Sequence, residues 1–203
     1  MSPRRAAVVM QFKVTLREVS PRVWRRIQVP ETYSFWDLHV AIQDAMGWLD
    51  YHLHEFTLTG PEGEPVRVGI PGDDDWQETP CLDGNEEPLS RYFGPHNKKA
   101  LYAYDFGDDW QHDVVFEKTL PGDPLLKYPL CVDGKRRCPP EDCGGSWGYQ
   151  QMLRALANPR HSEHQEWKTW AGRGFDPEKF DAAKVKFDNP KTRWKIAFES
   201  GGR

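Results

Sequence analysis

The clearest pattern of apolar and polar positions runs through residues 8–17, where the two classes alternate. Alternation over this length predicts a half-buried strand, because successive side chains of a strand point to opposite faces. The same alternation returns at residues 23–29, after a turn at Ser20-Pro21, and together the two segments predict a hairpin. The apolar positions of the first segment are Val8, Met10, Phe12, Val14 and Leu16.

A helix is predicted directly after this hairpin, from both a cap and a helical period. Ser34 is a favourable N-cap, and Asp37 stands three residues later, which is the spacing of a capping box. Gly47 supplies a C-terminal stop. The apolar positions that form one helical face between them are Phe35, Leu38, Ile42, Ala45 and Met46.

Further strands are predicted in the middle of the chain. Residues 52–59 are interpreted as a third strand. Residues 101–106 and 110–120 stand on either side of Gly107-Asp108-Asp109, a sequence typical of a turn. These two segments therefore predict a second hairpin.

The segment between these strands, residues 60–98, has little periodicity and several Pro and Gly residues. We interpret it as a long insertion in loop conformation, with one short helix near residues 89–93. It belongs to an acidic stretch, because residues 60–125 hold 15 Asp and Glu against 5 Lys and Arg. A balance of this sign disfavours broad binding to nucleic acid, which requires a basic surface.

The last third of the chain is turn-rich first and helical afterwards. Residues 121–147 carry turn signals and three cysteines, and residues 148–157 and 162–171 then fit helices. A third helix is predicted from Asp176-Pro177, since proline suits the first helical position. The helical part spans about residues 148–190.

The order of these elements predicts the fold class. Helices follow strands as a block, which favours an α+β fold over an alternating α/β fold. We expect a mixed, mainly antiparallel sheet that begins as a β-grasp-like hairpin, helix and strand. The 203 residues suit a single domain over 1–203.

The ends of the chain and its cysteines bear on location. The apolar run near the N-terminus has five residues, too few for the core of a signal peptide or for a membrane span. We therefore expect a cytoplasmic protein that does not associate with membranes. In that reducing compartment the four cysteines are expected as thiols or metal ligands before disulfides.

Histidine and aspartate near the strand ends form the first candidate site. His52 and His54 would share one face of a strand and could border one pocket with Asp105, Asp108 and His112. Imidazole and carboxylate together bind zinc, iron or manganese and also perform acid–base chemistry. The alternative is structural: the histidines cap the core with hydrogen bonds, and the aspartates build the turn.

The second candidate is the cysteine set Cys131, Cys138 and Cys143. Zinc takes four ligands, often in closely spaced pairs, and here Cys81 or a histidine would have to supply the fourth. Zinc or another divalent metal, a disulfide or redox pair, and small buried thiols that hold a turn all remain open for these residues.

The third candidate is basic. Arg25 and Arg26 directly follow Trp24 on the first hairpin, and Lys135, Arg136 and Arg137 lie inside the cysteine segment. Basic residues beside aromatics suit contact with phosphates and bases. More often such residues form a solvated face or pair with the acidic segment.

Four ordered motifs resemble the plasmid pRiA4b ORF-3-like family, and the resemblance runs from about residue 10 to residue 190. The resemblance implies mostly uncharacterised proteins that are often met in plasmids and mobile elements. It supplies no established catalytic residues. The motifs are VWRRI at 23–27, the segment from Leu38-His39 through Met46-Gly47-Trp48 to HLHEF at 52–56, YDFGDDW at 104–110 with His112, and Cys131 through CPPEDCGG at 138–145.

Three hypotheses of function follow. The leading one is an accessory or interaction module without established activity, with another protein as its partner, because no complete catalytic signature is recognised in the sequence. The first alternative is a metal-dependent hydrolase-type enzyme with His52, His54, His112 and Asp105 around one pocket. The second is a nucleic-acid-associated protein of mobile elements.

Overall fold

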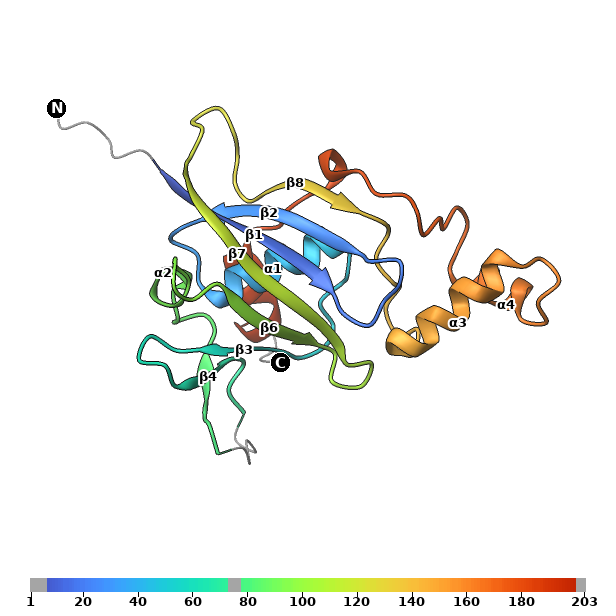
Figure 1. Cartoon of the computed structure of the whole chain (residues 1–203), viewed down its shortest axis with the longest axis horizontal. Helices are drawn as coiled ribbons and strands as arrows, with labels where there is room; N and C mark the ends of the chain where they lie inside the picture. The colour runs from blue at the N-terminus through green and yellow to red at the C-terminus, as the bar shows by residue number, and fades with distance from the viewer. Residues whose placement is uncertain (1–6, 73–77, 200–203) are drawn as a thin grey trace.

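The alternating N-terminal segment forms the first hairpin of a large sheet in the computed structural model, which describes residues 7–72 and 78–199. The eight strands described there lie in the order β5-β4-β3-β6-β7-β1-β2-β8 (Figure 1). All neighbours pair antiparallel except β4 and β5, so the mixed, mainly antiparallel sheet is confirmed. The strands are β1 Val8–Leu16, β2 Trp24–Pro30, β3 His54–Thr59, β4 Pro65–Gly69, β5 Cys81–Asp83, β6 Lys99–Tyr104, β7 Trp110–Pro121 and β8 Leu130–Lys135.

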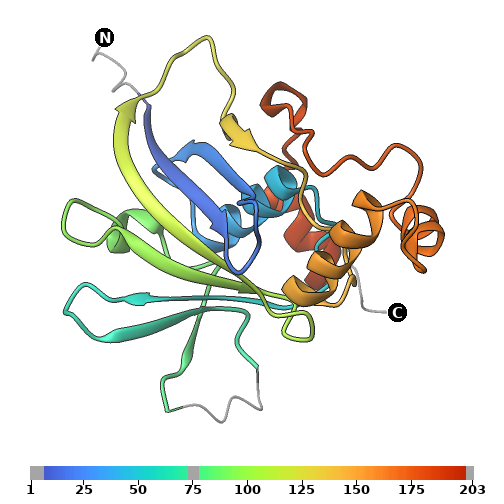
Figure 2. The same cartoon turned by 45° about the vertical axis from the view of Figure 1, so that its right-hand side comes forward.

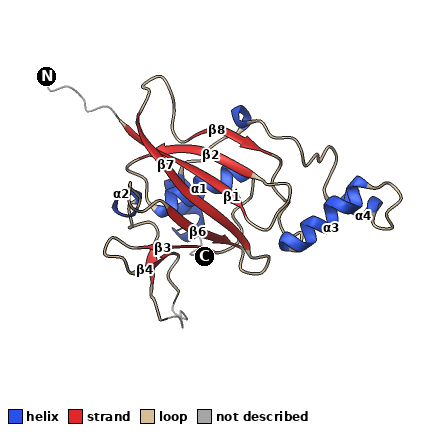
Figure 3. Ribbon diagram, in the orientation of Figure 1, coloured by secondary structure: helices blue, strands red, loops and turns tan. Residues whose placement is uncertain are grey.

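Helix α1 (Phe35–Met46) lies against one face of this sheet, and it begins and ends where its caps predict (Figures 1 and 3). The Ser34 hydroxyl accepts a hydrogen bond from Asp37 N at 3.2 Å, and the Asp37 carboxylate accepts one from Ser34 N at 3.0 Å. Gly47 closes the helix in the left-handed region, with φ of 89°. Capping of both ends satisfies backbone groups that the helix itself leaves unpaired.

The main core fills the space between α1 and the sheet. Its ring contacts join the helix to several strands: Phe35 lies 5.2 Å from Phe56, and Phe56 lies 4.6 Å from Tyr102, measured between ring centroids. Residues of alternate positions in β1, such as Phe12 and Val14, are fully buried on this face. The opposite face of the sheet carries no helix among the described residues (Figure 1).

Apart from α3 (Gly145–Ala157), which has 13 residues, the remaining helices are short, and two of them stand to one side of the sheet (Figure 3). They are α2 Leu89–Tyr92, α3 Gly145–Ala157, α4 His164–Trp170, a 3-10 turn at Ala182–Lys184, α5 Pro190–Trp194 and a π-helical turn at Lys195–Glu199. No helix in the described part of the chain is long and apolar enough to cross a membrane. The strands and helices together confirm the α+β class.

The C-terminal segment packs on the outer side of α1. Trp194 meets Trp36 edge to face at 5.0 Å, and the Trp36 indole N–H donates to the Pro190 carbonyl at 3.0 Å. Arg193 donates to the Asp44 carboxylate of α1 at 2.7 Å. Helix α1 is therefore held between the sheet and the chain's last described residues.

Three expectations about irregular segments were wrong. The insertion at 60–98 contains β4 and β5, although the short helix expected near residue 89 is present as α2. Its residues 73–77 lie outside the described part. The turn-rich segment 121–147 contains β8, and the helix expected from Asp176-Pro177 is replaced by the short turns at 182–184 and the later α5. These strands are short, and each is stabilised by pairing with a neighbouring strand. Such pairing leaves no periodic pattern in the local sequence.

Candidate functional site

Three loops meet at one end of the sheet, and we call residues 47–53, 105–109 and 138–147 the loop end. The first joins α1 to β3, the second joins β6 to β7, and the third leads from β8 into α3. Figure 2 shows α3 beginning beside the β6–β7 turn. The loop end therefore collects parts of three motifs that lie far apart in the sequence.

Hydrogen bonds fasten the first loop to the third. The Trp48 indole N–H donates to the Pro139 carbonyl at 2.9 Å in a buried position. Directly after it, Leu49 N donates to the Glu141 carboxylate at 2.7 Å. A buried aromatic donor and a charged acceptor both rank among the stronger side-chain contacts, so the two loops are held in one arrangement.

The Tyr104 hydroxyl, at the end of β6, bridges the same loops. It accepts a hydrogen bond from Tyr51 N at 3.1 Å and donates to the two Glu141 oxygens at 3.2 and 3.3 Å. Burial raises the pKa of Glu141, although its hydrogen bonds act in the opposite direction. Glu141 thus links the first and third loops through hydrogen bonds.

The third loop also approaches the β6–β7 turn very closely. Gly144 N donates to the Asp108 carboxylate at 3.2 Å. A Cβ atom at Gly145 would lie 2.4 Å from the Asp108 carbonyl oxygen, and the φ of Gly145 is 65°. Only glycine combines that backbone conformation with that close approach.

Asp105 organises the β6–β7 turn. One carboxylate oxygen, Oδ1, accepts hydrogen bonds from Gly107 N at 3.0 Å and Asp108 N at 3.3 Å. Its backbone N–H donates to the Leu53 carbonyl at 2.9 Å. These bonds fix the carboxylate and leave its other oxygen, Oδ2, directed to a different partner.

That partner is His52. The His52 Nε2 atom lies 3.6 Å from Asp105 Oδ2 and 3.2 Å from Asp142 Oδ1. One ligand atom from each of the three residues lies within 4.8 Å of the others, and no second group of this kind occurs in residues 7–72 and 78–199. The group combines one imidazole with two carboxylates.

The Nε2 atom of His52 is shielded from solvent and has no hydrogen-bond partner among the described residues, despite two oxygens nearby. The Asp105 oxygen lies beyond hydrogen-bond distance, and the nearer Asp142 oxygen is not in line for a hydrogen bond from this nitrogen. Buried polar nitrogens are normally paired. His54 Nδ1 and His112 Nε2 are also unpaired in the described structure, but the metal-ligand group of two carboxylates and one imidazole forms only around His52 Nε2 in residues 7–72 and 78–199.

His54 lies in a different environment. Its ring stacks on the ring of His39 in α1, with centroids 3.4 Å apart and an angle of 8° between the planes. Burial, together with the neighbouring His39, holds the pKa of His54 well below its ordinary value of 6.5. His54 is a neutral core residue.

A chain of hydrogen bonds runs through His39, the partner of His54 in this stack. Gln43 donates to the Tyr102 hydroxyl at 2.8 Å, and that hydroxyl donates to His39 Nδ1 at 2.8 Å. His39 Nε2 then carries the proton and donates to Asp50 at 2.7 Å. Burial, together with the charge of Arg193, keeps the pKa of His39 low, and Arg193 also lies 3.5 Å from Asp50. His39 is therefore a neutral imidazole, and its contact with Asp50 is a hydrogen bond to a carboxyl group and not an ion pair.

His112 is buried as well, and Nδ1 donates to the Tyr102 carbonyl at 3.3 Å. Burial lowers its pKa to about 4. Of the pocket expected at His52, His54, Asp105, Asp108 and His112, the structure thus brings together only His52 and Asp105. Asp108 holds the turn and the third loop. His112 follows the structural alternative through its hydrogen bond, whereas His54 is a packing residue whose Nδ1 has no hydrogen-bond partner among the described residues. The four-residue hydrolase pocket is not built.

The cysteines do not form a metal-ligand group in the described structure. Cys131, Cys138 and Cys143 are free thiols, so no disulfide joins them. These three are buried in the core, and burial raises the pKa of each, in the case of Cys143 to about 12. A protonated buried thiol is a poor nucleophile and a poor ligand.

Arg25 is not available to nucleic acid, because it is 1% exposed. Its guanidinium donates to the Ala45 carbonyl at 2.7 Å and lies 3.6 Å from the centroid of the Phe180 ring. Arg25 therefore joins β2 to α1 and to the C-terminal region. The prediction that Arg25 binds phosphate was wrong. Alternation along the strand showed only that Arg25 points to the face opposite its two neighbours, and did not show that its charged end is buried.

The other basic candidates are mostly engaged within the chain. Arg26 forms two hydrogen bonds with Glu117, at 2.7 and 2.9 Å. Arg136 pairs with Glu178 at 3.0 Å. Arg137 lies 5.1 Å from the Phe175 ring centroid, and Lys135 is exposed.

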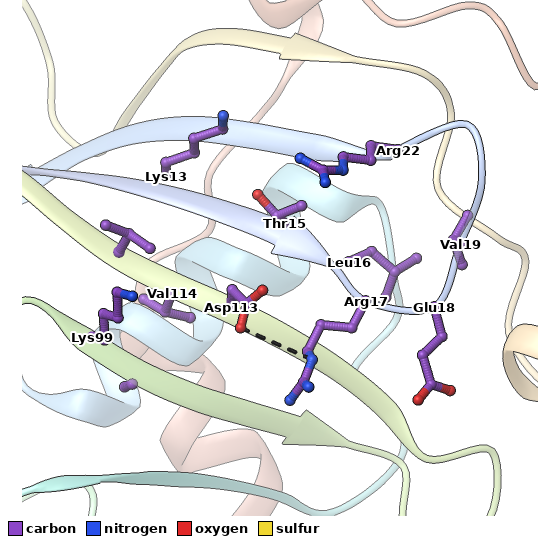
Figure 4. A pocket seen from close by; sticks show the side chains of 12 residues that line it. Lys13, Thr15, Leu16, Arg17, Glu18, Val19, Arg22, Lys99, Asp113 and Val114 are labelled. Carbon is purple, nitrogen blue, oxygen red and sulfur yellow. Dashed lines mark ion pairs between the residues drawn. The ribbon is translucent and has the colours of Figure 1, made fainter.

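A shallow pocket with several cations lies on the sheet face opposite α1 (Figure 4). Lys13, Arg22 and Lys99 line it, together with Arg17, which lies 3.9 Å from Asp113. Its positive charge is reduced, since Asp113 and Glu18 also line it. This surface differs in sign and composition from the loop end.

All three loops lie within a segment that matches a known family. A family model described as plasmid pRiA4b ORF-3-like protein matches residues 8–184. The chain belongs to this family. It is 40% identical over 166 residues to uncharacterized protein y4hQ of Sinorhizobium fredii, a match that covers 82% of each chain. It also resembles the crystal structure of protein of unknown function MM3350 from Methanosarcina mazei Go1, with a TM-score of 0.84 and 46% identity over 90% of this chain and 100% of that one.

Sequence reasoning missed the third member of the His52 group. Asp142 lies in the CPPEDCGG motif, but its partner stands 90 positions earlier in the chain. His39 and Asp50 were missed in the same way, although His39 belongs to one of the four motifs. Membership of a motif indicated that these residues matter, but which motif residues contact one another depends on the tertiary fold.

Proposed function

We propose that this family member is a protein-interaction module that binds a partner with basic and apolar side chains at the loop end. No activity is established for the relatives named above, whose names describe them as uncharacterised or of unknown function. The free thiols of Cys131, Cys138 and Cys143 support a reducing, cytoplasmic location.

The observation that carries this proposal is a set of large apolar side chains exposed on the loop end. Trp147 and Tyr51 are 74% and 73% exposed. Exposed aromatics are unusual on a surface without a partner, and tryptophan and tyrosine are the residues that most often anchor interfaces. The full set is Leu49 at 61%, Tyr51 at 73%, Leu53 at 55%, Phe106 at 57% and Trp147 at 74%.

The charge of the loop end defines the kind of partner. Its three segments contain six acidic residues and neither lysine nor arginine. A partner with cations around an apolar anchor would complement this surface and would be steered toward it. The acidic residues are Asp50, Asp105, Asp108, Asp109, Glu141 and Asp142.

The fastening of the loops supports a binding role in a second way. Glu141, Tyr104 and Trp48 hold the loops through side-chain hydrogen bonds before any partner arrives. A surface that is ordered in advance loses less entropy on binding. The nucleic-acid alternative has less support, because Arg25 is buried and Arg26 is paired.

The test is selection of peptides from a random display library on the full-length protein. We expect enriched sequences with lysine or arginine beside an aromatic or aliphatic residue, and weaker binding as salt increases. Trp147→Ser and Tyr51→Ser should each reduce the affinity of a selected peptide by about tenfold or more.

Leu125→Ser is the matched control, because Leu125 is 91% exposed but lies outside the loop end. Its affinity for the same peptides should equal that of the unchanged protein. Enriched peptides without basic residues would contradict the proposed partner chemistry. Equal loss in the control and the loop-end variants would show that the loop end is not the binding surface.

A further inference from the structure

We propose that His52, Asp105 and Asp142 bind one divalent transition-metal ion through His52 Nε2, Asp105 Oδ2 and an oxygen of Asp142. This inference is independent of the peptide-binding proposal, since it concerns a small ion held within the loops and not the apolar side chains around them. It also differs from the sequence hypothesis, which placed the metal among four residues of which two are buried elsewhere.

The first argument is distance. Two ligand atoms that each lie about 2.1 Å from an ion at the tetrahedral angle are about 3.4 Å apart. His52 Nε2 lies 3.2 Å from Asp142 Oδ1 and 3.6 Å from Asp105 Oδ2. The two measured distances lie on either side of this value, so small shifts would place both pairs around one ion.

The second argument is the state of the His52 nitrogen. Nε2 is shielded from solvent and makes no hydrogen bond within the described structure. A protonated histidine that served only as an ion-pair partner would direct its N–H at a carboxylate oxygen. An imidazole nitrogen that lies within 3.6 Å of two carboxylate oxygens, without a hydrogen bond to either, is suited to bind a shared ion through its lone pair.

The third argument is the orientation of the Asp105 carboxylate and the exposure of the Asp142 carboxylate. Asp105 Oδ1 is occupied by the N–H groups of Gly107 and Asp108, which leaves Oδ2 for the ion. Metal ligands are commonly oriented by such outer hydrogen bonds. The side chain of Asp142 is 69% exposed, so the site is open to solvent on that side and an ion can enter.

The ligand set selects the class of ion. One neutral imidazole and two carboxylates carry two negative charges, which balance a dication. Calcium and magnesium prefer oxygen ligands alone, whereas zinc, manganese and iron accept imidazole with carboxylate. Zinc should bind more tightly than manganese, following the general order of these ions.

The experiment uses the full chain, purified without an affinity tag and dialysed against a chelator that is then removed. Binding of Mn²⁺ is followed by loss of the free-ion paramagnetic resonance signal, and binding of Zn²⁺ by titration calorimetry. We expect one ion per chain, with zinc displacing manganese. His52→Gln, Asp105→Asn and Asp142→Asn should each weaken binding by at least about tenfold, the loss that even outer partners of a ligand produce.

Two control variants separate coordination at this site from general electrostatic attraction and from binding by thiols. Asp109→Asn removes one charge from the same turn, and its exposed carboxylate contacts only Gln111 among the described hydrogen bonds, so it should leave affinity within about twofold. Cys138→Ser should also leave zinc affinity unchanged, which excludes binding by thiols. The side chain of Asp142 is largely exposed, so weaker metal binding in Asp142→Asn cannot be attributed to loss of the fold.

Binding of neither ion at one per chain up to about 1 mM would overturn the proposal, since that limit corresponds to about 4 kcal/mol of binding free energy. Equal affinity in the unchanged protein and in the Asp142→Asn and His52→Gln variants would also overturn it. Trp147→Ser should lose peptide binding but keep the metal, so the two proposals can fail separately.

Discussion

His52 and His54 stand two residues apart in the sequence, yet the structure gives them opposite environments. His54 lies in β3, is 3% exposed and stacks on another histidine in the core. His52 precedes the strand and lies between two carboxylates at the surface. The same side chain is thus a neutral packing element in one place and a candidate ligand in the other.

The difference shows that the environment of a histidine depends on where its backbone lies relative to the start of a strand. Alternation places residues i and i+2 on one face only while both belong to the strand. Because β3 begins at His54, the rule does not extend to His52. Variants at the two positions test whether the histidines differ as their surroundings require.

The largest expected effect is a loss of stability in mild acid. His39, His54 and His112 have folded pKa values below 6.5, so they are neutral in both states above that pH and contribute no pH dependence there. Below pH 6.5 the unfolded chain takes up protons that the folded chain resists. The free energy of unfolding should then fall by up to about 1.4 kcal/mol per pH unit for each residue, as urea unfolding between pH 7.5 and pH 5 would measure.

The control for this prediction is a variant of one buried histidine. Asp44 and Asp50 have pKa values raised by burial and therefore oppose the trend at lower pH. His54→Gln should remove about one histidine's share of the slope. A slope that is the same in this variant and in the unchanged protein would contradict neutral burial of His54.

The next effect is a difference in packing. His54→Ala should lower the free energy of unfolding by about 3 kcal/mol, because it leaves a cavity beside His39 and Trp36. His52→Ala should cost less than about 1 kcal/mol, since its ion pairs are partly exposed. Chemical denaturation at pH 7.5 compares them, and equal costs would remove the distinction between the two positions.

A slightly smaller effect is expected from metal. Zinc at 100 times its dissociation constant should raise the free energy of unfolding by about 2.7 kcal/mol. The increase should persist in His54→Gln and disappear in His52→Gln, as thermal unfolding with and without zinc would show. Stabilisation that depends on His54 would place the ion in the core and not at the loop end.

The smallest effect is expected at the exposed aromatics. Tyr51→Ser and Trp147→Ser should change the free energy of unfolding by no more than about 0.5 kcal/mol, because both side chains lie largely in solvent. Denaturation of each variant beside the unchanged protein measures this. A large loss would mean that these residues support the fold, and their effect on peptide binding would then be indirect.

Much of the fold could be predicted from the sequence where the signals are local. The alternation of β1 and β2 and the capping box of α1 lie within a few residues, and so does the turn between β6 and β7. These signals act on the backbone directly, through side-chain direction and hydrogen bonds to nearby amides. The family resemblance rested on the same segments and is confirmed by the match over residues 8–184.

The remainder was decided by tertiary structure. The short strand β5 pairs with β4 through three residue pairs and shows no pattern of its own. Less of the candidate site was predictable, because His52 and Asp142 meet only where two loops converge, and because β3 starts two residues later than its sequence suggests. The sequence by itself therefore determined the types of residue available and the main elements, whereas contacts between distant loops determined which residues share a site.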